Sequence, residues 1–558
     1  MKKLLLTIFI IFLASPFIQA DNYIFFNITQ GMSVSQIQTE LQTVIDNATI
    51  KDTVIVTGSK TNADAELVLH IIKGIRVVWR ANYLSSTPFG ADNLISFTGD
   101  GLFAVDFGAL ITENANAINA AGKGSYVIVC DNGKVQTSGD GMNAITTYGS
   151  VFVMDNAQLS STTGETIASN SDNASVLVGG GTISATSENA IITWGKNAQI
   201  LISGGHVYNN ADVSSYVINA AWSNNAFVHV SGNAIVEAKG YGFGIYSAGN
   251  AQVSGNAQVH INKGGNDPSI AAVRAVNDVT VTDNAKVSAS NNCAIYCFEN
   301  VTVSWNAIVE AKNDAIAIKI YGESGPTVGY VTVTDNAQVI AAHNYAISSH
   351  NAVVLNGGVV FAYGNEMSHI INNEYFFGTT RGVILAWNKD AGNTKYEKFS
   401  TDDLFISPET ATAHWDFIGG KAGISYANGT NTGFIPIEEV SIEGMGVKPI
   451  TNDELRITVY PNPTTGELYI QSSKFKVQEF KGSKVQEFKS LKVQSVEVFD
   501  VYGRKIKHSS AAAEPQPSGQ SFNPSIPQSF NISGFPSGFY FVKIATENGV
   551  VVKKVVKE

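Results

Sequence analysis

The chain alternates apolar and polar residues in short runs that are separated by turns. A typical stretch, from Phe298 to Tyr321, reads FENVTVSWNAIVEAKNDAIAIKIY and breaks at an Asn before the alternation resumes. Because successive side chains of a strand point to opposite faces, this pattern predicts β-strands with one buried face. The runs are too short to be stable alone, so each predicted strand needs neighbours to pair with.

The stretch is one copy of a repeat that covers most of the chain. Each copy has an apolar pair, a turn, a V-x-V-[S/T] run and then x-N-A-x-V-x-A. The first apolar residue of each copy, here called the anchor, recurs every 22 to 29 residues. This period is typical of a solenoid, whose coils stack about 4.8 Å apart. The anchors are Ile118, Ile145, Ile167, Ile191, Ile218, Ile245, Val273, Ile295, Ile318 and Ile347.

An Asn holds an equivalent place in the turn of many copies. Asn tolerates a positive φ best after Gly, so we expect this residue to make the tight bend. Stacked Asn side chains also hydrogen-bond from coil to coil. The Ala that follows is expected to point inward, where space is small. These turn positions are Asn156, Asn233, Asn256, Asn284, Asn306 and Asn336, with Gly180 in one copy.

These repeats resemble the right-handed parallel β-helix of pectin-lyase-like proteins, and the resemblance supplies the hand of the winding. Met32 to Asp46 has helical apolar spacing and resembles the amphipathic helix that caps such proteins. The expected fold class is all-β: a right-handed parallel β-helix solenoid followed by a small C-terminal β-sandwich. The predicted segments are a cap at 21–50, the β-helix at 51–363, a β-rich closing segment at 364–446 and a linker at 447–456.

The first twenty residues have the pattern of a secretory signal peptide. Lys2 and Lys3 precede an uncharged apolar run from Leu4 to Leu13, and small residues lead to a predicted cut after Ala20. The run is too short for a membrane span of about 20 residues, and no other segment is long enough. We therefore expect export without a transmembrane helix.

The last hundred residues carry several separate motifs. They include Tyr460, Pro461, Asn462 and Pro463 (YPNP), Gly503 and Arg504 in DVYGR, GFY at 538–540 and a lysine-rich end. Residues 457–558 thereby resemble the C-terminal sorting domain of cargo of the type IX secretion system of Bacteroidota. The resemblance implies a partnership with the type IX secretion machinery and export to the cell surface or the extracellular space. Two insertions, 476–494 and 508–529, are expected to be expanded loops.

Charge and cysteine content limit the partners. Charged residues make up only 15 % of the chain, and the net charge of −11 is carried by residues 21–450. An acidic body repels phosphate, so we expect no nucleic-acid partner. As a separate expectation, the protein is a monomer. Cys293 and Cys297 lie about 13 Å apart along a predicted strand, too far for a disulfide. Both, with Cys130, are expected to be buried and apolar in character.

Local signatures of β-helix polysaccharide lyases and hydrolases are absent. We expect no carboxylate at a matching coil position beside any of His206, His229, His260, His343 or His350. Asp140, in SGDGMNAI, resembles a Ca²⁺-binding Asp of some carbohydrate-binding β-helices, although an Asp that forms a turn is the alternative. Ca²⁺ is therefore the one candidate cofactor.

The residue after each anchor should point outward, because side chains alternate. In five consecutive coils this column reads Tyr246, Arg274, Tyr296, Lys319 and Ser348. Aromatic rings and an Arg fork suit an acidic polysaccharide, and a self-satisfied cation–π ladder is the alternative. Trp194, Trp222 and Trp305 form a weaker aromatic set that we assign to turn packing.

The predicted function is therefore that of an exported, non-catalytic β-helix that binds a glycan or another surface. Two alternatives remain at this stage. One is a polysaccharide lyase or glycoside hydrolase that acts on an acidic polysaccharide, and the other is a structural stalk.

Overall fold

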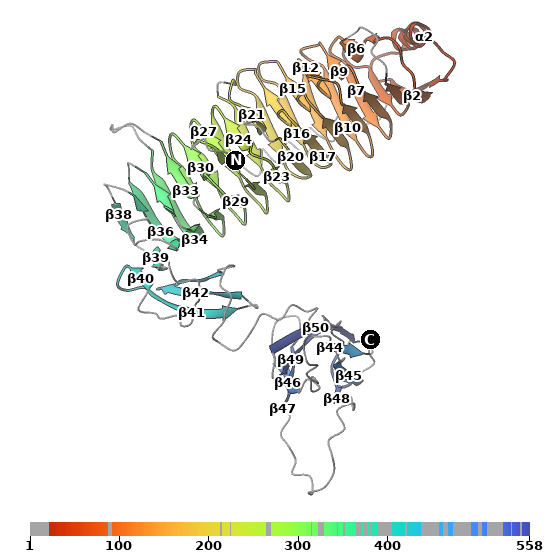
Figure 1. The fold of residues 1–558 in the computed structure, drawn as a ribbon. Coiled ribbons are helices and arrows are strands. Elements are labelled where there is room, and N and C mark those ends of the chain that lie inside the picture. The colour runs from red at the N-terminus through yellow and green to blue at the C-terminus, as the bar shows by residue number, and fades with distance from the viewer. Residues whose placement is uncertain are drawn as a thin grey trace, which may run out of the picture. The chain divides into compact units, whose positions relative to one another are not determined.

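The structure, a computed structural model, describes most of the repeat region and parts of the remainder (Figure 1). It describes residues 22–363 except 87–91, 212–214, 224, 264–268, 314, 322–328, 343 and 350–351. Beyond these it describes 371–372, 376–379, 381–387, 404–418, 421–436, 457–460, 467–472, 493–499, 505–510, 528–536, 538–546 and 549–557. The predicted signal peptide lies outside the described residues. Contacts divide the chain into two compact units, the first holding the β-helix and the second holding the C-terminal strands.

The β-helix has about twelve turns, and each full turn contributes one strand to each of three parallel ladders (Figure 1). Ladder 1 consists of β1 (Tyr23–Ile28), β2 (Thr53–Lys60), β4 (Arg76–Trp79), β7 (Leu102–Asp106), β10 (Tyr126–Cys130), β13 (Ser150–Val153), β16 (Ser175–Val178), β19 (Gln199–Ile202), β22 (Phe227–Val230), β25 (Asn250–Val253), β28 (Val279–Val281), β31 (Val301–Val303), β34 (Val331–Ala342), β36 (Val353–Tyr363) and β38 (Phe376–Thr379). Strands β2, β34 and β36 bend and continue into ladder 2.

Ladder 2 adds β5 (Asn82–Ser85), β8 (Ala109–Thr112), β11 (Lys134–Thr137), β14 (Gln158–Ser161), β17 (Thr182–Ala185), β20 (His206–Asn209), β23 (Ile235–Ala238), β26 (Gln258–Ile261), β29 (Lys286–Ala289), β32 (Ile308–Ala311) and β39 (Val383–Trp387). Ladder 3 consists of β3 (Leu67–His70), β6 (Asn93–Thr98), β9 (Asn116–Ala120), β12 (Ile145–Thr147), β15 (Ile167–Ser169), β18 (Ile191–Thr193), β21 (Tyr216–Ala220), β24 (Phe243–Ser247), β27 (Ala271–Ala275), β30 (Cys293–Cys297), β33 (Ile316–Ile320), β35 (Ile347–Ser348) and β37 (Ile371–Asn372).

The predicted anchors form one column inside ladder 3. Each anchor pairs with the next one along the chain, from Ile118 to Ile347, and every one of them is buried. The column extends beyond the predicted copies, to Ile95 and Leu67 on one side. Burial of this continuous apolar column drives the stacking of coils that are individually too short to fold. The predicted parallel β-helix is confirmed; the hand of its winding stays a prediction, because strand register does not fix it.

The turn between ladders 1 and 2 corrects one detail of the sequence analysis. The positive φ belongs to the residue before the Asn, as at Asp155 (56°), Asp283 (63°) and Asp335 (59°), and not to the Asn. The same place is taken by Gly232 and Gly255 in other coils. The preceding residue thus reverses the chain, and the Asn side chain is left to bond along the stack.

The Asn side chains form the predicted hydrogen-bonded ladder. Asn336 Nδ2 donates to Asn306 Oδ1 (3.2 Å), and Asn306 Nδ2 donates to Asn284 Oδ1 (3.1 Å). The series continues to Asn256 (3.1 Å) and Asn233 (3.0 Å). The Ala after each Asn is buried, as expected. This Asn ladder therefore joins five consecutive coils outside the apolar core.

The N-terminal end of the stack is closed by helix α2 (Val34–Asn47), as predicted. Ser33 Oγ accepts from Gln36 N–H (3.1 Å) and caps the helix, which buries Val34, Ile37, Leu41 and Ile45. Two Gln side chains of the polar face satisfy the free edge of β3. Gln38 Oε1 accepts from Val68 N–H (3.0 Å), and Gln42 both accepts from and donates to the backbone of His70. The cap thus replaces the hydrogen bonds that a further coil would make.

At the other end, β40 (Leu404–Ser407) pairs antiparallel with β39 and ends ladder 2. A three-stranded sheet follows, with β41 (Thr412–Ile418), β42 (Lys421–Asn428) and β43 (Asn431–Pro436). Asn428 Nδ2 donates to Gly382 O (3.1 Å), and the buried Asn431 donates to Gly358 O (3.0 Å). These bonds join Asn428 and Asn431, which belong to the first unit, to the last coils.

The C-terminal unit contains two antiparallel sheets, which confirms the predicted sandwich. One has β44 (Ile457–Tyr460), β45 (Glu467–Ser472) and β48 (Gln528–Asn531), and the other has β46 (Val493–Phe499), β47 (Lys505–Ser510), β49 (Gly538–Thr546) and β50 (Gly549–Lys557). Its buried residues include Val498, Val542, Ile544 and Val555. The two insertions separate β45 from β46 and β47 from β48, and their central parts lie outside the described residues. In the part of the chain that is described, no helix is long and apolar enough to cross a membrane.

Replacing Asn306 with Ala tests the Asn ladder. The change removes two side-chain hydrogen bonds at an exposed turn, so we expect a loss of about 1 kcal/mol in the free energy of unfolding, measured by urea denaturation of the full chain. Asn156→Ala is the control, because Asn156 holds the same turn position but does not belong to the Asn ladder. An equal loss in both variants would show that the turn, and not the ladder, accounts for the effect.

Candidate functional site

The strand register places the four predicted site residues in one column on ladder 3. Tyr246 in β24 pairs with Arg274 in β27, Arg274 pairs with Tyr296 in β30, and Tyr296 pairs with Lys319 in β33. Ser348 follows in the next coil. We call the first four of these residues the ladder 3 stripe. The stripe exists as a geometrical feature, and its part in binding stays a prediction.

Arg274 is the centre of the stripe. Its guanidinium carbon lies 4.6 Å from the ring centroid of Tyr246 and 5.3 Å from that of Tyr296. Its Nη1 donates to Ser269 Oγ (3.2 Å), and its buried Nε has no hydrogen-bond partner. Lys319 Nζ lies 5.5 Å from the Tyr296 ring on the other side. Two cations therefore flank one aromatic ring.

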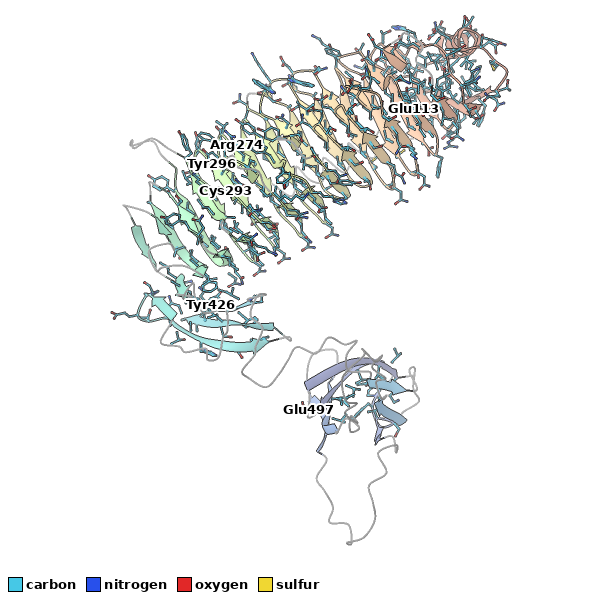
Figure 2. All side chains as sticks on the ribbon, in the orientation of Figure 1. Glu113, Arg274, Cys293, Tyr296, Tyr426 and Glu497 are labelled. Atoms are coloured by element: carbon cyan, nitrogen blue, oxygen red, sulfur yellow. The ribbon has the colours of Figure 1, made fainter. Side chains whose placement is uncertain are left out.

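Two further aromatic residues, which the sequence analysis missed, cover part of the stripe. Phe298 and Tyr321 each lie two residues after a stripe residue, so they point outward in the adjacent column. The Tyr296 ring lies 5.5 Å from Phe298 and 6.0 Å from Tyr321 (Figure 2 labels Arg274 and Tyr296). Tyr296 is consequently only 6 % exposed, whereas Tyr321 is 51 % exposed. The accessible surface is thus formed by Tyr321, Phe298 and the two cations above a buried Tyr296.

The two cations have no acidic partner among the described residues. The ion pairs of the described part join Arg80, His206, Lys239, His260 and Lys286 to Asp or Glu, and none includes Arg274 or Lys319. On a body with excess negative charge, these two side chains make a local positive surface.

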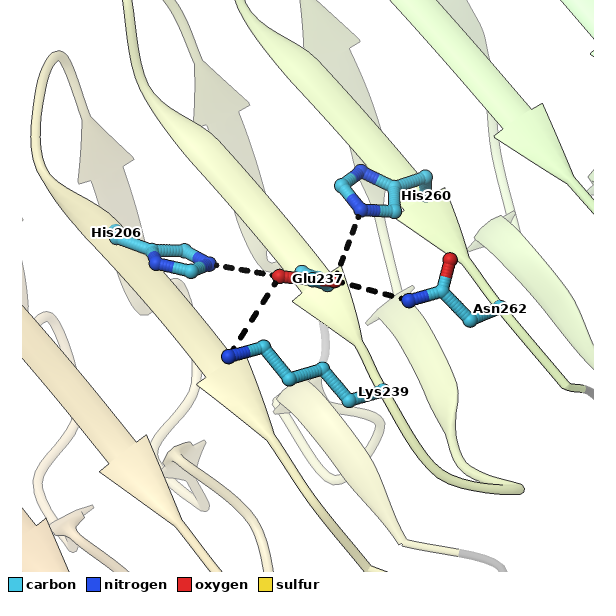
Figure 3. Close-up of polar contacts among 5 residues, drawn as sticks. All are labelled: His206, Glu237, Lys239, His260 and Asn262. Atoms are coloured by element: carbon cyan, nitrogen blue, oxygen red, sulfur yellow. Dashed lines mark hydrogen bonds and ion pairs between the residues drawn. The ribbon is translucent and has the colours of Figure 1, made fainter. Parts of the chain in front are cut away.

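A second polar cluster lies on ladder 2 and corrects the expectation for two His residues (Figure 3). Glu237 Oε2 is 3.0 Å from His206 Nε2, and Glu237 Oε1 is 3.2 Å from His260 Nε2. Asn262 Nδ2 donates to Oε1 (2.9 Å), and Lys239 Nζ is 3.9 Å from Oε2. His206 and His260 therefore do share a carboxylate. His229 instead contacts Ser254 Oγ (2.8 Å), and His343 and His350 lie outside the described residues.

The reason for this error lies in the choice of column. Tyr208, Glu237 and His260 pair across β20, β23 and β26 of ladder 2, one coil apart. The sequence analysis compared positions only around the anchors of ladder 3. The same alignment applied to the x-V-x-A runs brings Glu237 and His260 together.

Burial and charge determine the protonation of this cluster. Burial raises the pKa of Glu237, but the hydrogen bond from Asn262 and the contacts with His260 and Lys239 outweigh it, so the pKa lies below its ordinary value. Burial lowers the pKa of His206, and the contact with Glu237 offsets this only in part. The cluster is therefore an ionised carboxylate that orients two imidazoles. Lys239 Nζ also lies 3.6 Å from the Tyr208 ring centroid, so its charge is held over the same surface.

The proposed metal residue Asp140 is an exposed turn residue beside Gly141, whose φ is 68°. It belongs to none of the described groups in which three potential metal ligands converge. Such a group exists elsewhere, at Asp106, Cys130 and Asp131. The sequence analysis missed it because the three residues come from two successive coils and share no short motif. Cys293 and Cys297 are buried and form no disulfide, as predicted, and burial raises the pKa of each thiol to about 12.

The three turn tryptophans do not pack into the fold as expected. Trp194 is 39 % exposed, Trp222 69 % and Trp305 62 %. Trp305 also has a φ of 61°, at the place where neighbouring coils have Gly or Asp. Their assignment to turn packing was therefore wrong.

Replacing Glu237 with Gln tests the ladder 2 cluster. Because the folded-state pKa values of Glu237 and His206 both lie below their ordinary values, the unfolded chain binds more protons, and stability falls as pH falls. At pH 7 the variant should be less stable than the wild type by about 1–3 kcal/mol in urea denaturation, since a charged acceptor is lost. This difference should shrink as the pH falls from the ordinary carboxyl pKa of the unfolded chain through the lower folded-state pKa of Glu237, and it should vanish below that. Glu310→Gln is the control, because Glu310 lies in the same column as Glu237 and has one cation partner. A stability difference between the wild type and Glu237→Gln that does not depend on pH would contradict the account.

The comparisons with known proteins concern the C-terminal unit. Residues 458–558 match the family model of the secretion system C-terminal sorting domain. No curated protein and no solved structure matches the chain. Tyr460 of the predicted motif ends β44, while Pro461, Asn462, Pro463, Gly503 and Arg504 lie outside the described residues. The match confirms the sorting domain and its implied interaction with the type IX secretion machinery. The chain is therefore a parallel β-helix protein with a type IX secretion system sorting domain, exported to the cell surface or the extracellular space.

Proposed function

We propose that this exported chain binds an acidic glycan, without catalysis, on the outer face of ladder 3 between β24 and β33. The observation that carries the proposal is the state of Arg274. Its guanidinium lies between two Tyr rings. Its Nη1 donates a hydrogen bond to Ser269, and its buried Nε has no hydrogen-bond partner. The planar fork of a guanidinium matches a carboxylate in a bidentate arrangement.

The rings beside Arg274 supply the second half of the recognition. Tyr321 presents half of its surface to solvent beside Phe298, at a centroid distance of 5.5 Å. Exposed ring faces offer large apolar area at a low cost in conformational entropy, which suits the apolar face of a sugar. The buried Tyr296 holds the rings and the cations in place from below.

The spacing of the two cations favours a polymer over a single sugar. Arg274 and Lys319 lie two coils apart, which is about 10 Å along the stack. One sugar cannot reach both side chains, whereas a chain with repeated carboxylates can. The acidic remainder of the body repels such a polymer and so restricts binding to this face.

Removal of the fork should weaken binding. Arg274→Ala in the full chain is expected to lower the affinity for polygalacturonate at least about tenfold, equivalent to about 1.4 kcal/mol, by isothermal titration calorimetry. Arg274→Lys should restore only part of it, because an ammonium group cannot bind in a bidentate manner. Neutral glucan should bind neither to the wild type nor to the Arg274→Ala variant.

Lys134→Ala is the matched control, because Lys134 is a partly exposed outward cation on ladder 2. Equal affinities of the wild type, Arg274→Ala and Lys134→Ala would contradict the site. No binding of any acidic glycan to the wild type would favour the structural stalk instead.

One observation favours a second candidate, a polysaccharide lyase. Glu237 orients His206 and His260 beside Lys239, and an imidazole oriented by a carboxylate is a common general base. An eliminative lyase produces an unsaturated uronide, which absorbs in the ultraviolet. Such a product with the wild type and none with His260→Ala would establish this candidate; no product with the wild type would exclude it for the substrates tried.

A further inference from the structure

We propose that Asp106, Cys130 and Asp131 form a binding site for a thiophilic divalent cation of the zinc class, at the turn between ladders 1 and 2. The potential ligand atoms of these three residues, two carboxylate oxygens and one sulfur, all lie within 4.8 Å of one another. The site is independent of the glycan face and of the ladder 2 cluster.

Strand register brings the ligands together. Cys130, the last residue of β10, pairs with Asp106, the last residue of β7, one coil below. Both residues point outward, yet they are only 6 % and 7 % exposed. Asp131 follows directly in the turn, with a φ of 51°. Two coils therefore contribute to one site.

An unused buried acceptor points to a ligand. Arg80 occupies one oxygen of Asp106, with Nε at 3.0 Å and Nη2 at 2.7 Å from Oδ2. The other oxygen, Oδ1, is buried and has no hydrogen-bond partner. Arg80 thus fixes and neutralises one side of Asp106, while the opposite side lacks the partner that a buried carboxylate oxygen requires.

The charges around this oxygen favour a cation. Two carboxylates and a thiol lie within 4.8 Å of one another, with one Arg as the counter-charge on the far oxygen of Asp106. A bound divalent cation stabilises both carboxylates and the thiolate. Binding therefore breaks the S–H bond of Cys130 and releases its proton to solvent.

The donor set selects the class of ion. Ca²⁺ and Mg²⁺ take oxygen ligands only, whereas Zn²⁺, Co²⁺ and Cd²⁺ accept a thiolate with carboxylates. With Zn–S near 2.3 Å and Zn–O near 2.0–2.2 Å, adjacent ligand atoms in a tetrahedron lie about 3.3–3.7 Å apart, so the three groups need to approach by no more than about 1.5 Å.

Co²⁺ titration of the full chain tests the site directly. The wild type should bind about one equivalent with a thiolate-to-Co²⁺ charge-transfer band in the near ultraviolet, release about one proton, and show a raised midpoint of thermal unfolding. Zn²⁺ should displace Co²⁺ and abolish the band, and Ca²⁺ should not. Cys130→Ser should lose the band, and Asp131→Asn should weaken Co²⁺ binding at least about tenfold without a change in backbone shape.

Cys293→Ser is the matched control and should keep the band, because Cys293 has no converging carboxylates among the described residues. Absence of the band in the folded wild type would overturn the proposal. A band that survives Cys130→Ser, or affinity unaffected by Asp131→Asn, would place the metal elsewhere and overturn it as well.

Discussion

Hydrogen bonds between the backbones of successive coils determine where every other group of this protein lies. They run in register along three ladders, so residues 21 to 30 positions apart in sequence become neighbours at about 4.8 Å. A one-residue slip would move the apolar column to solvent on all coils that follow. The apolar core, the Asn ladder and the terminal cap all act to preserve this register.

The same constraint builds the polar features on the outside. A single side chain in a coil contributes little, but the stack aligns it with chemically different residues from the coils above and below. Arg274 receives its two Tyr rings in this way, and Glu237 receives two imidazoles. The carboxylates and the thiol beside Asp106 are brought together by the same spacing. Charge clusters in this protein are therefore products of register and not of local sequence motifs.

This explains what the sequence can and cannot predict. The anchors and the ladder 3 stripe follow from a repeat that is regular around ladder 3. The predicted position of the positive φ in the turn was wrong by one residue, because composition alone does not tell whether Asp155 or Asn156 reverses the chain. The burial of Tyr296 was missed since it depends on rings from a second column, and the Glu237 cluster was missed because only one column was compared. The sorting motifs needed no three-dimensional information.

A crystal structure of the full chain with a bound oligogalacturonate would test the central claim most directly, namely that the outer face of ladder 3 is the functional surface. The account predicts a sugar carboxylate on the guanidinium of Arg274, with sugar rings against Tyr321 and Phe298 and the oligomer running along the stack toward Lys319. An oligomer bound across ladder 2 beside Glu237, or none bound at saturating concentration, would contradict it.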